Sequence, residues 1–152
     1  MASYIRISSP EADGLGGVLT DIVVLNGSDR TLAEYGHRPP ESVRRIEARQ
    51  IVVTPDATTL CLPKAMIELL GLRSKGRVMA ETASGETETE LFSGAYLVVA
   101  GREALVECVA LPDGSQPLLG TIPLAIMGLE PDVATHELCL LPFDTSDTYI
   151  RA

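Results

Sequence analysis

Short apolar runs separated by turn residues make up most of this chain, and they restrict it to a fold built mainly from strands. Runs such as "GVLTDIVVL" and "AYLVVA" are rich in aliphatic and β-branched residues, and they stop at Asn26-Gly27 and at Gly101. Runs of this kind that end at glycine or asparagine are typical of strands and their turns. We therefore predict an all-β fold, a small barrel with one or two short helices.

Two segments carry helix signals instead. In "SDRTLAEYG", Thr31 and Glu34 have the spacing of a capping box, in which two side chains satisfy the first free N–H groups of a helix. In "PKAMIELLG", Pro63 stands where a helix begins and Gly71 where it ends. Each segment is long enough for about two turns of helix.

The segment "RVMAETASGETETELFSG" predicts a β-hairpin with its tip at Ala83-Ser84-Gly85. Glu86, Glu88 and Glu90 follow the tip at the spacing of one strand face. Neighbouring carboxylates repel one another, so we expect this face to be in water. We interpret it as a solubilising edge, and the alternative is a flap that prefers basic or polar peptides.

Length and composition favour a single domain. The chain has 152 residues, of which 45% are apolar, enough to build one hydrophobic core. We expect one domain over residues 1–152, with N-terminal strands and a helix (1–50), a core region (51–142) and a tail (143–152).

Charge and aromatic content argue against nucleic acid as a partner. The formal net charge is −9 and aromatic residues are 4% of the chain. Nucleic-acid surfaces need positive charge and, for single strands, rings on which bases stack. A basic cluster is interpreted as a solvated strand face; it consists of Arg38, Arg44, Arg45 and Arg49.

The sequence shows no sign of export, membrane insertion or metal binding. The N-terminus lacks the pattern of a signal peptide, and no apolar run reaches the ~18 residues of a membrane span. Cys61, Cys108 and Cys139 are far apart and have no disulfide or metal spacing. We expect a cytoplasmic protein with reduced thiols, no membrane partner, no metal and no cofactor.

Four segments between Arg45 and Pro142 are informative because of their order. An apolar strand and a tight loop lead into Ala57-Thr58-Thr59, then Leu62-Pro63 and a helix that ends in "LLGL". The hairpin follows, then Leu118-Leu119-Gly120 before "TIPLAIMGL", and finally the strand "HELCLLP". In this order the segments resemble the retropepsin-like aspartic peptidases, the single-domain family of retroviral type.

The resemblance fails at the centre of the site. The family carries Asp-Thr-Gly before the alanine that matches Ala57, and these positions hold Thr54, Pro55 and Asp56 here. In the family, two chains each contribute one Asp; one carboxylate activates water while the other, protonated, polarises the peptide carbonyl. A threonine hydroxyl has no useful basicity near neutral pH, and Pro55 offers neither a hydroxyl nor an N–H.

The resemblance implies a retropepsin-like β-barrel lobe that forms a homodimer, because one lobe makes only half of a cleft. We expect a catalytically inactive or impaired homologue that binds a peptide or protein segment as an added strand. The residues expected at the site are Thr54, Pro55, Asp56 and Ala57 of the loop, Ala83, Ser84 and Gly85 of the hairpin tip, and Leu119 and Gly120.

Two other functions stay open. Residues i and i+2 of an extended segment point the same way, so two copies of Asp56 could rebuild an acid pair across a dimer and give an active endopeptidase. The favoured interpretation of Asp56 is a turn residue after Pro55. The remaining alternative is a structural or regulatory dimer without a ligand cleft.

Two further sets of residues imitate catalytic motifs. Asp144-Thr145-Ser146 is similar to the missing triplet, but it follows the last strand and is interpreted as part of a solvated tail. A Cys–His pair could combine Cys61 or Cys139 with His37 or His136. Both cysteines stand among leucines, where buried and inert thiols are the usual case.

Overall fold

Strands dominate the structure, a computed structural model that describes residues 4–7 and 17–142. The strands are β1 (Tyr4–Ile7), β2 (Val18–Asn26), β3 (Arg45–Val53), β4 (Leu60–Pro63), β5 (Arg73–Thr82), β6 (Gly85–Val99), β7 (Arg102–Leu111), β8 (Leu118–Leu119), β9 (Leu129–Asp132) and β10 (Glu137–Leu140). The helices are α1 (Gly27–Glu34), the 3-10 helix η1 (Pro40–Ser42), α2 (Lys64–Leu70) and α3 (Thr121–Met127). The all-β class is confirmed, with three α-helices in these residues instead of one or two.

Pairing between β6 and β7 closes the main sheet into a barrel. Starting from β6, the neighbours are β2, β3, β8, β4 and β7, and β7 pairs again with β6. The pairs β3–β8 and β4–β7 are parallel, and the other pairs in this ring are antiparallel. The order of strand, loop, strand and α2, then hairpin, then β8 and α3, is the order of a retropepsin-like lobe expected from the sequence.

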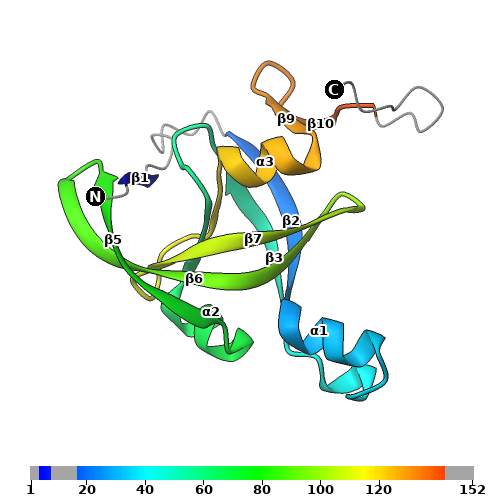
Figure 1. Ribbon diagram of the computed structural model, residues 1–152. Coiled ribbons are helices and arrows are strands. Elements are labelled where there is room, and N and C mark those ends of the chain that lie inside the picture. The colour runs from blue at the N-terminus through cyan, green and yellow to red at the C-terminus, as the bar shows by residue number, and fades with distance from the viewer. Residues whose placement is uncertain (1–3, 8–16, 143–152) are drawn as a thin grey trace, which may run out of the picture.

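The β5–β6 hairpin extends beyond this ring. Residues 85–90 of β6 pair with β5, whereas the ring strands β7 and β2 pair with β6 only from Leu91 onward. The hairpin turns at Ala83 and Ser84, between the end of β5 and the start of β6. β1 lies along β5 in parallel orientation, at the edge of the sheet (Figure 1).

Aliphatic side chains form the core in two clusters. The larger cluster fills the ring and includes Val24, Leu60 and Leu97, each fully buried. Burial alternates along β2 and β7 because successive side chains of a strand point to opposite faces. The smaller cluster lies between the hairpin, β1 and the ring, and it consists of Ile5, Val52, Ala57, Cys61, Val109, Leu111 and Leu118.

Asn26 caps helix α1, so the predicted capping box at Thr31 is wrong. The Asn26 side chain accepts a hydrogen bond from the N–H of Asp29 (2.9 Å) and donates one to the carbonyl of Leu70 (2.8 Å). Thr31 instead donates its hydroxyl to the Gly27 carbonyl one turn earlier. Asparagine is as good a cap as threonine, so the turn that closes β2 starts the helix directly.

Helix α2 has the boundaries that the sequence predicts. It follows Pro63 and ends at Gly71, whose φ of 64° lies in the left-handed region. The Gly71 N–H donates to the carbonyls of Ile67 and Glu68, which closes the last turn.

No helix within the described residues is both long and apolar enough to cross a membrane.

Two arginines of the basic cluster hold a buried carboxylate. Asp29 is 1% exposed, and its oxygens lie 2.5 Å from Arg38 and 2.8 Å from Arg44. The hydrogen bond from Arg44 lowers the pKa of Asp29 to about 2. Arg38 and Arg44 stay partly exposed but lie outside the strands, so the interpretation as a strand face is wrong for them. It holds for Arg45 and Arg49, which are exposed on β3.

A two-stranded ribbon, β9 and β10, lies beside α3, and the side chain of Arg102 helps to hold it. The Arg102 guanidinium donates to the carbonyls of Met127 (3.0 Å) and Gly128 (2.6 Å), and also to that of Leu141. The ribbon leaves Cys139 exposed, so the expectation that this thiol is buried is wrong. A two-stranded sheet covers its side chains less than the barrel does.

Candidate functional site

The loop after β3 holds the first group of residues expected at the site, Thr54–Ala57. Thr54 is fully buried; its N–H donates to the Leu119 carbonyl (3.0 Å), and its hydroxyl accepts the N–H of Asp56 (3.0 Å). Pro55 and Asp56 form an exposed turn. This is the local turn in which a threonine hydroxyl binds the backbone two residues later.

Thr54 and Asp56 consequently have different surroundings. Thr54 is at 0% exposure inside the barrel, whereas the side chain of Asp56 is in solvent. Side chains of residues i and i+2 point the same way only in extended backbone. The turn at Pro55-Asp56 ends the extended backbone, so Thr54 and Asp56 need not point the same way. The Thr54 hydroxyl is therefore buried and already hydrogen-bonded, whereas the Asp56 carboxylate is exposed.

Leu119 and Gly120 pack directly against this loop. The N–H of Thr121 donates to the Ala57 carbonyl (2.9 Å), and the N–H of Ile122 donates to the Thr58 carbonyl (2.9 Å). A β-carbon on Gly120 would lie inside contact distance of the Ala57 carbonyl oxygen. The structure therefore brings together two of the three segments expected at the site, Thr54–Ala57 and Leu119-Gly120.

The third expected segment, the hairpin tip, is held by its own hydrogen bonds. The Thr82 hydroxyl donates to the Gly85 carbonyl (2.7 Å) and accepts the N–H of Ser84 (3.2 Å). Gly85 has a φ of 115°, which other residues rarely adopt. Ala83 and Ser84 are exposed, so the main chain of the tip is accessible.

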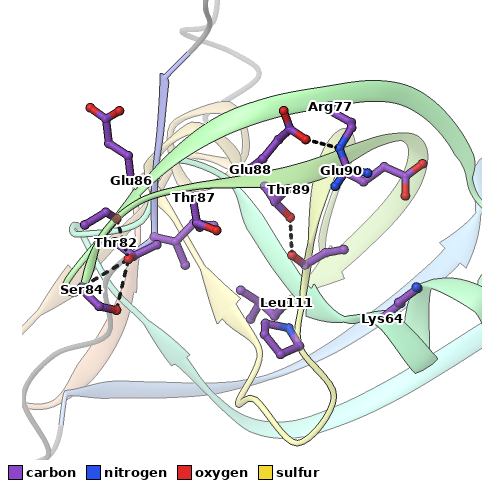
Figure 2. A pocket seen from close by; sticks show the side chains of 14 residues that line it. Lys64, Arg77, Thr82, Ser84, Glu86, Thr87, Glu88, Thr89, Glu90 and Leu111 are labelled. Carbon is purple, nitrogen blue, oxygen red and sulfur yellow. Dashed lines mark hydrogen bonds and ion pairs between the residues drawn. The ribbon is translucent and has the colours of Figure 1, made fainter.

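A cavity of about 670 Å³ lies under the hairpin, between it and the ends of β7 and α2 (Figure 2). Thr89 points inward and donates its hydroxyl to the Ala110 carbonyl (2.7 Å). The residues that line the cavity are Ile7, Lys64, Arg77, Thr82, Ser84, Gly85, Glu86, Thr87, Glu88, Thr89, Glu90, Ala110, Leu111 and Pro112. The tip contributes to this lining, and the Thr54–Ala57 loop does not.

The expectation that the hairpin glutamates are all in water holds for two of the three. Glu86 and Glu88 are exposed, and Glu88 forms an ion pair with Arg77 (2.5 Å) across the hairpin. Glu90 is half-buried and accepts the Ser74 hydroxyl (2.5 Å). The cavity therefore has an acidic rim with two basic groups, Arg77 and Lys64, on its lining.

A smaller hollow of about 230 Å³ lies beside the loop. It is lined by β1, the loop, the hairpin and α3 through Ile5, Arg6, Pro55, Ala57, Thr58, Glu81 and Thr121. Arg6, Thr58 and Glu81 were not expected at the site. No local pattern in the sequence indicates Arg6, because β1 reaches the loop through long-range contacts with β5 and Thr58.

The buried thiols are poor nucleophiles. Burial raises the pKa of Cys61 to about 12, and burial likewise raises the pKa of Cys108 well above its usual range. His37 and His136 are both exposed, while Cys61 is in the core. In the described part of the chain, no group of three or more His, Cys, Asp or Glu residues is arranged to hold a metal ion. The triplet Asp144-Thr145-Ser146 lies outside the described residues.

One solved structure similar to this chain is the solution structure of the simian foamy virus (mac) protease. The two share 19% sequence identity, with a TM-score of 0.42, and the similarity covers 71% of this chain and 94% of that one. No protein-family model matches the sequence. No curated protein matches it either.

Proposed function

We propose that this protein is a non-catalytic, peptide-binding homologue of the retropepsin-like peptidases and that it acts as a homodimer. One observation carries the proposal. At the position where the chemistry needs a carboxylate open to water, Thr54 is buried and its hydroxyl accepts the N–H of Asp56. A hydroxyl held in this way cannot take a proton from water near neutral pH.

Binding needs none of the missing chemistry. An extended peptide can add to a sheet through main-chain hydrogen bonds, with alternate side chains in pockets. The accessible tip and the 670 Å³ cavity beneath the hairpin support this mode. Thr87, which is exposed on the cavity lining, offers a hydroxyl group for a polar ligand, and the glutamates favour a basic one.

An apolar patch supports the homodimer. Leu105, Ile122 and Ile126 are 62%, 50% and 56% exposed, and together they line a hollow of about 380 Å³ between β7 and α3. Exposed apolar side chains that share one surface are typical of protein interfaces. The patch lies next to Thr58, so a second copy bound there would stand beside the loop.

Asp56 supports a second candidate, an active endopeptidase. Its carboxylate is exposed on a turn, where it could meet the same residue of a second copy. Such a pair would have to share a proton to work at all.

Incubating the purified protein with a peptide library from acid to neutral pH separates these functions. We expect saturable binding and no cleavage, with the same result for Asp56→Asn. The triple variant Thr54→Asp, Pro55→Thr and Asp56→Gly restores the family triplet, and we expect it to cleave some of the same peptides. Cleavage by the wild type that Asp56→Asn abolishes would instead establish the endopeptidase. A dimer that binds no peptide would point to a structural module.

A further inference from the structure

We infer that β1 is a built-in occupant of a peptide groove between β5 and Thr58, and that this groove takes a foreign peptide with the same pattern once β1 leaves. The pattern is an extended segment with β-branched apolar residues at alternate positions and a polar residue between them. This inference rests on the proposed peptide-binding function and adds the class of ligand and its regulation.

The main chain of β1 is bound on both edges, as an added strand would be. On one edge β1 pairs in parallel with β5, from Tyr4 opposite Met79 to Ile7 opposite Thr82. On the other edge, the N–H of Arg6 donates to the hydroxyl of Thr58 (2.8 Å), and the N–H of Thr58 donates to the carbonyl of Arg6 (2.9 Å). The strand therefore bridges the hairpin and the segment that follows the Thr-Pro-Asp loop.

The side chains of β1 follow the alternation that a pocketed peptide needs. Ile5 is 8% exposed and belongs to the smaller core cluster, together with Ala57, Cys61 and Leu118. Ile7 packs against the same cluster and is half-buried, whereas Arg6 is exposed. Specificity would thus come from two isoleucine positions, while the middle position is free to vary.

β1 also separates the hollows around the site. Ile7 lines the 670 Å³ cavity, Ile5 and Arg6 line the 230 Å³ hollow beside the loop, and Ile5 lines the 380 Å³ hollow next to α3. The three hollows therefore share β1 as a common border, and we expect them to join along β5 when β1 leaves.

β1 is attached more weakly than the ring strands. It has four residues, pairs with a single strand, and lies at the end of the sheet order, outside the closed ring. Short edge elements with few buried side chains detach at a fraction of the free energy that unfolds the core. A foreign peptide competes with β1 for the groove. Its apparent affinity is the intrinsic affinity multiplied by the fraction of molecules in which β1 has left.

The test uses the full chain and a synthetic peptide, acetyl-Ser-Tyr-Ile-Arg-Ile-Ser-amide, which copies residues 3–8. The variant Ile5→Asn with Ile7→Asn removes the apolar anchors of β1, and Arg6→Asn is the matched control on the opposite face. We expect the double variant to bind the labelled peptide roughly tenfold more tightly than the wild type or Arg6→Asn, measured by fluorescence anisotropy.

Hydrogen exchange shows whether the groove itself opens. In the double variant, the Thr58 amide should lose protection, and the peptide should restore it, while β2 and β6 keep theirs. Unchanged protection at Thr58, or equal peptide affinity in all three proteins, would overturn the inference. If library peptides protect the groove but the β1 peptide does not, the inference falls and the proposed function stands. If only the β1 peptide binds, the groove recognises only the protein's own N-terminal strand, and the proposed binding of other peptides is wrong.

Discussion

Gly120 holds the Thr54–Ala57 loop against α3, because only a residue without a side chain fits there. A β-carbon at this position would lie 2.7 Å from the Thr59 carbonyl oxygen and closer still to that of Ala57. Both atoms belong to the backbone, so neither can rotate away. We predict that Gly120→Ala lowers the free energy of unfolding by about 1–3 kcal/mol, measured by urea denaturation.

Gly36→Ala is the comparison for this variant. It adds the same methyl group at a place where nothing lies within 4 Å, with a φ of 78°. Its cost should be limited to the left-handed backbone, about 1 kcal/mol. If Gly120→Ala cost no more than Gly36→Ala, the loop could move away from α3, and its rigid placement would be wrong.

Asp29 should make stability depend on pH. Its folded pKa of about 2 lies below the ordinary 3.8, so its contribution is complete above pH 3.8 and is lost as the pH falls towards 2. Asp29→Asn should cost about 1–2 kcal/mol at pH 7, since the partner arginines are partly exposed and solvent weakens the pair. The difference between variant and wild type should shrink below pH 4 in urea titrations.

Glu34→Gln provides the control for Asp29. Glu34 pairs with Arg30 at 3.3 Å, but its side chain is 60% exposed. Exposed pairs contribute little, so we expect a change below about 0.5 kcal/mol at any pH. An Asp29→Asn variant as stable as Glu34→Gln at pH 7 would contradict the buried network.

At this scale the sequence predicted residue types better than residue environments. Pro63 and Gly71 bound α2 as expected, because helix ends depend on local backbone chemistry. The partners of Asp29 and the surroundings of Thr58 depend on segments far away in the chain, Arg44 and Arg6. No local sequence pattern predicts such long-range contacts.

The hairpin is tied to the ring by a side chain as well as by strand pairing. Thr89 of β6 donates its hydroxyl to the Ala110 carbonyl of β7. We predict that Thr89→Val, which keeps the shape and removes the donor, increases amide exchange along residues 85–90 and leaves β2 unchanged. Thr87→Val is the control, because Thr87 is exposed on the same face. Equal exchange in the two variants would mean that this hydrogen bond does not restrain the hairpin.

Elements with their own periodic pattern were predicted from the sequence, and their pairing was not. The strands, the hairpin and α2 follow from alternation and turn residues. The parallel placement of β1 beside β5, and the closure of β6 on β7, join segments separated by many residues. Local propensity does not specify such partners, because cross-strand contacts decide them.

For the whole molecule, the proposed homodimer should depend on the apolar patch at α3. Ile126 is 56% exposed beside Ile122 and Leu105. We predict that Ile126→Glu weakens self-association roughly tenfold or more, because it places a charge in the contact. Sedimentation velocity over a concentration series measures this.

Leu69→Glu is the matched control for self-association. Leu69 is 68% exposed on α2, away from the residues that line the hollow. It should sediment as the wild type does. A wild type that stays monomeric at every concentration would remove the dimer from the proposed function.

The meeting of β6 and β7 has a consequence for how the chain tolerates change. A closed ring of strands has no edge strand at which unfolding can start, so we expect the strands of the ring to open together. The β5–β6 hairpin outside the ring, with residues 85–90 of β6, and strand β1 beside it are not part of this cooperative unit. Insertions or new specificities can therefore accumulate on the β5–β6 hairpin at little risk to the barrel.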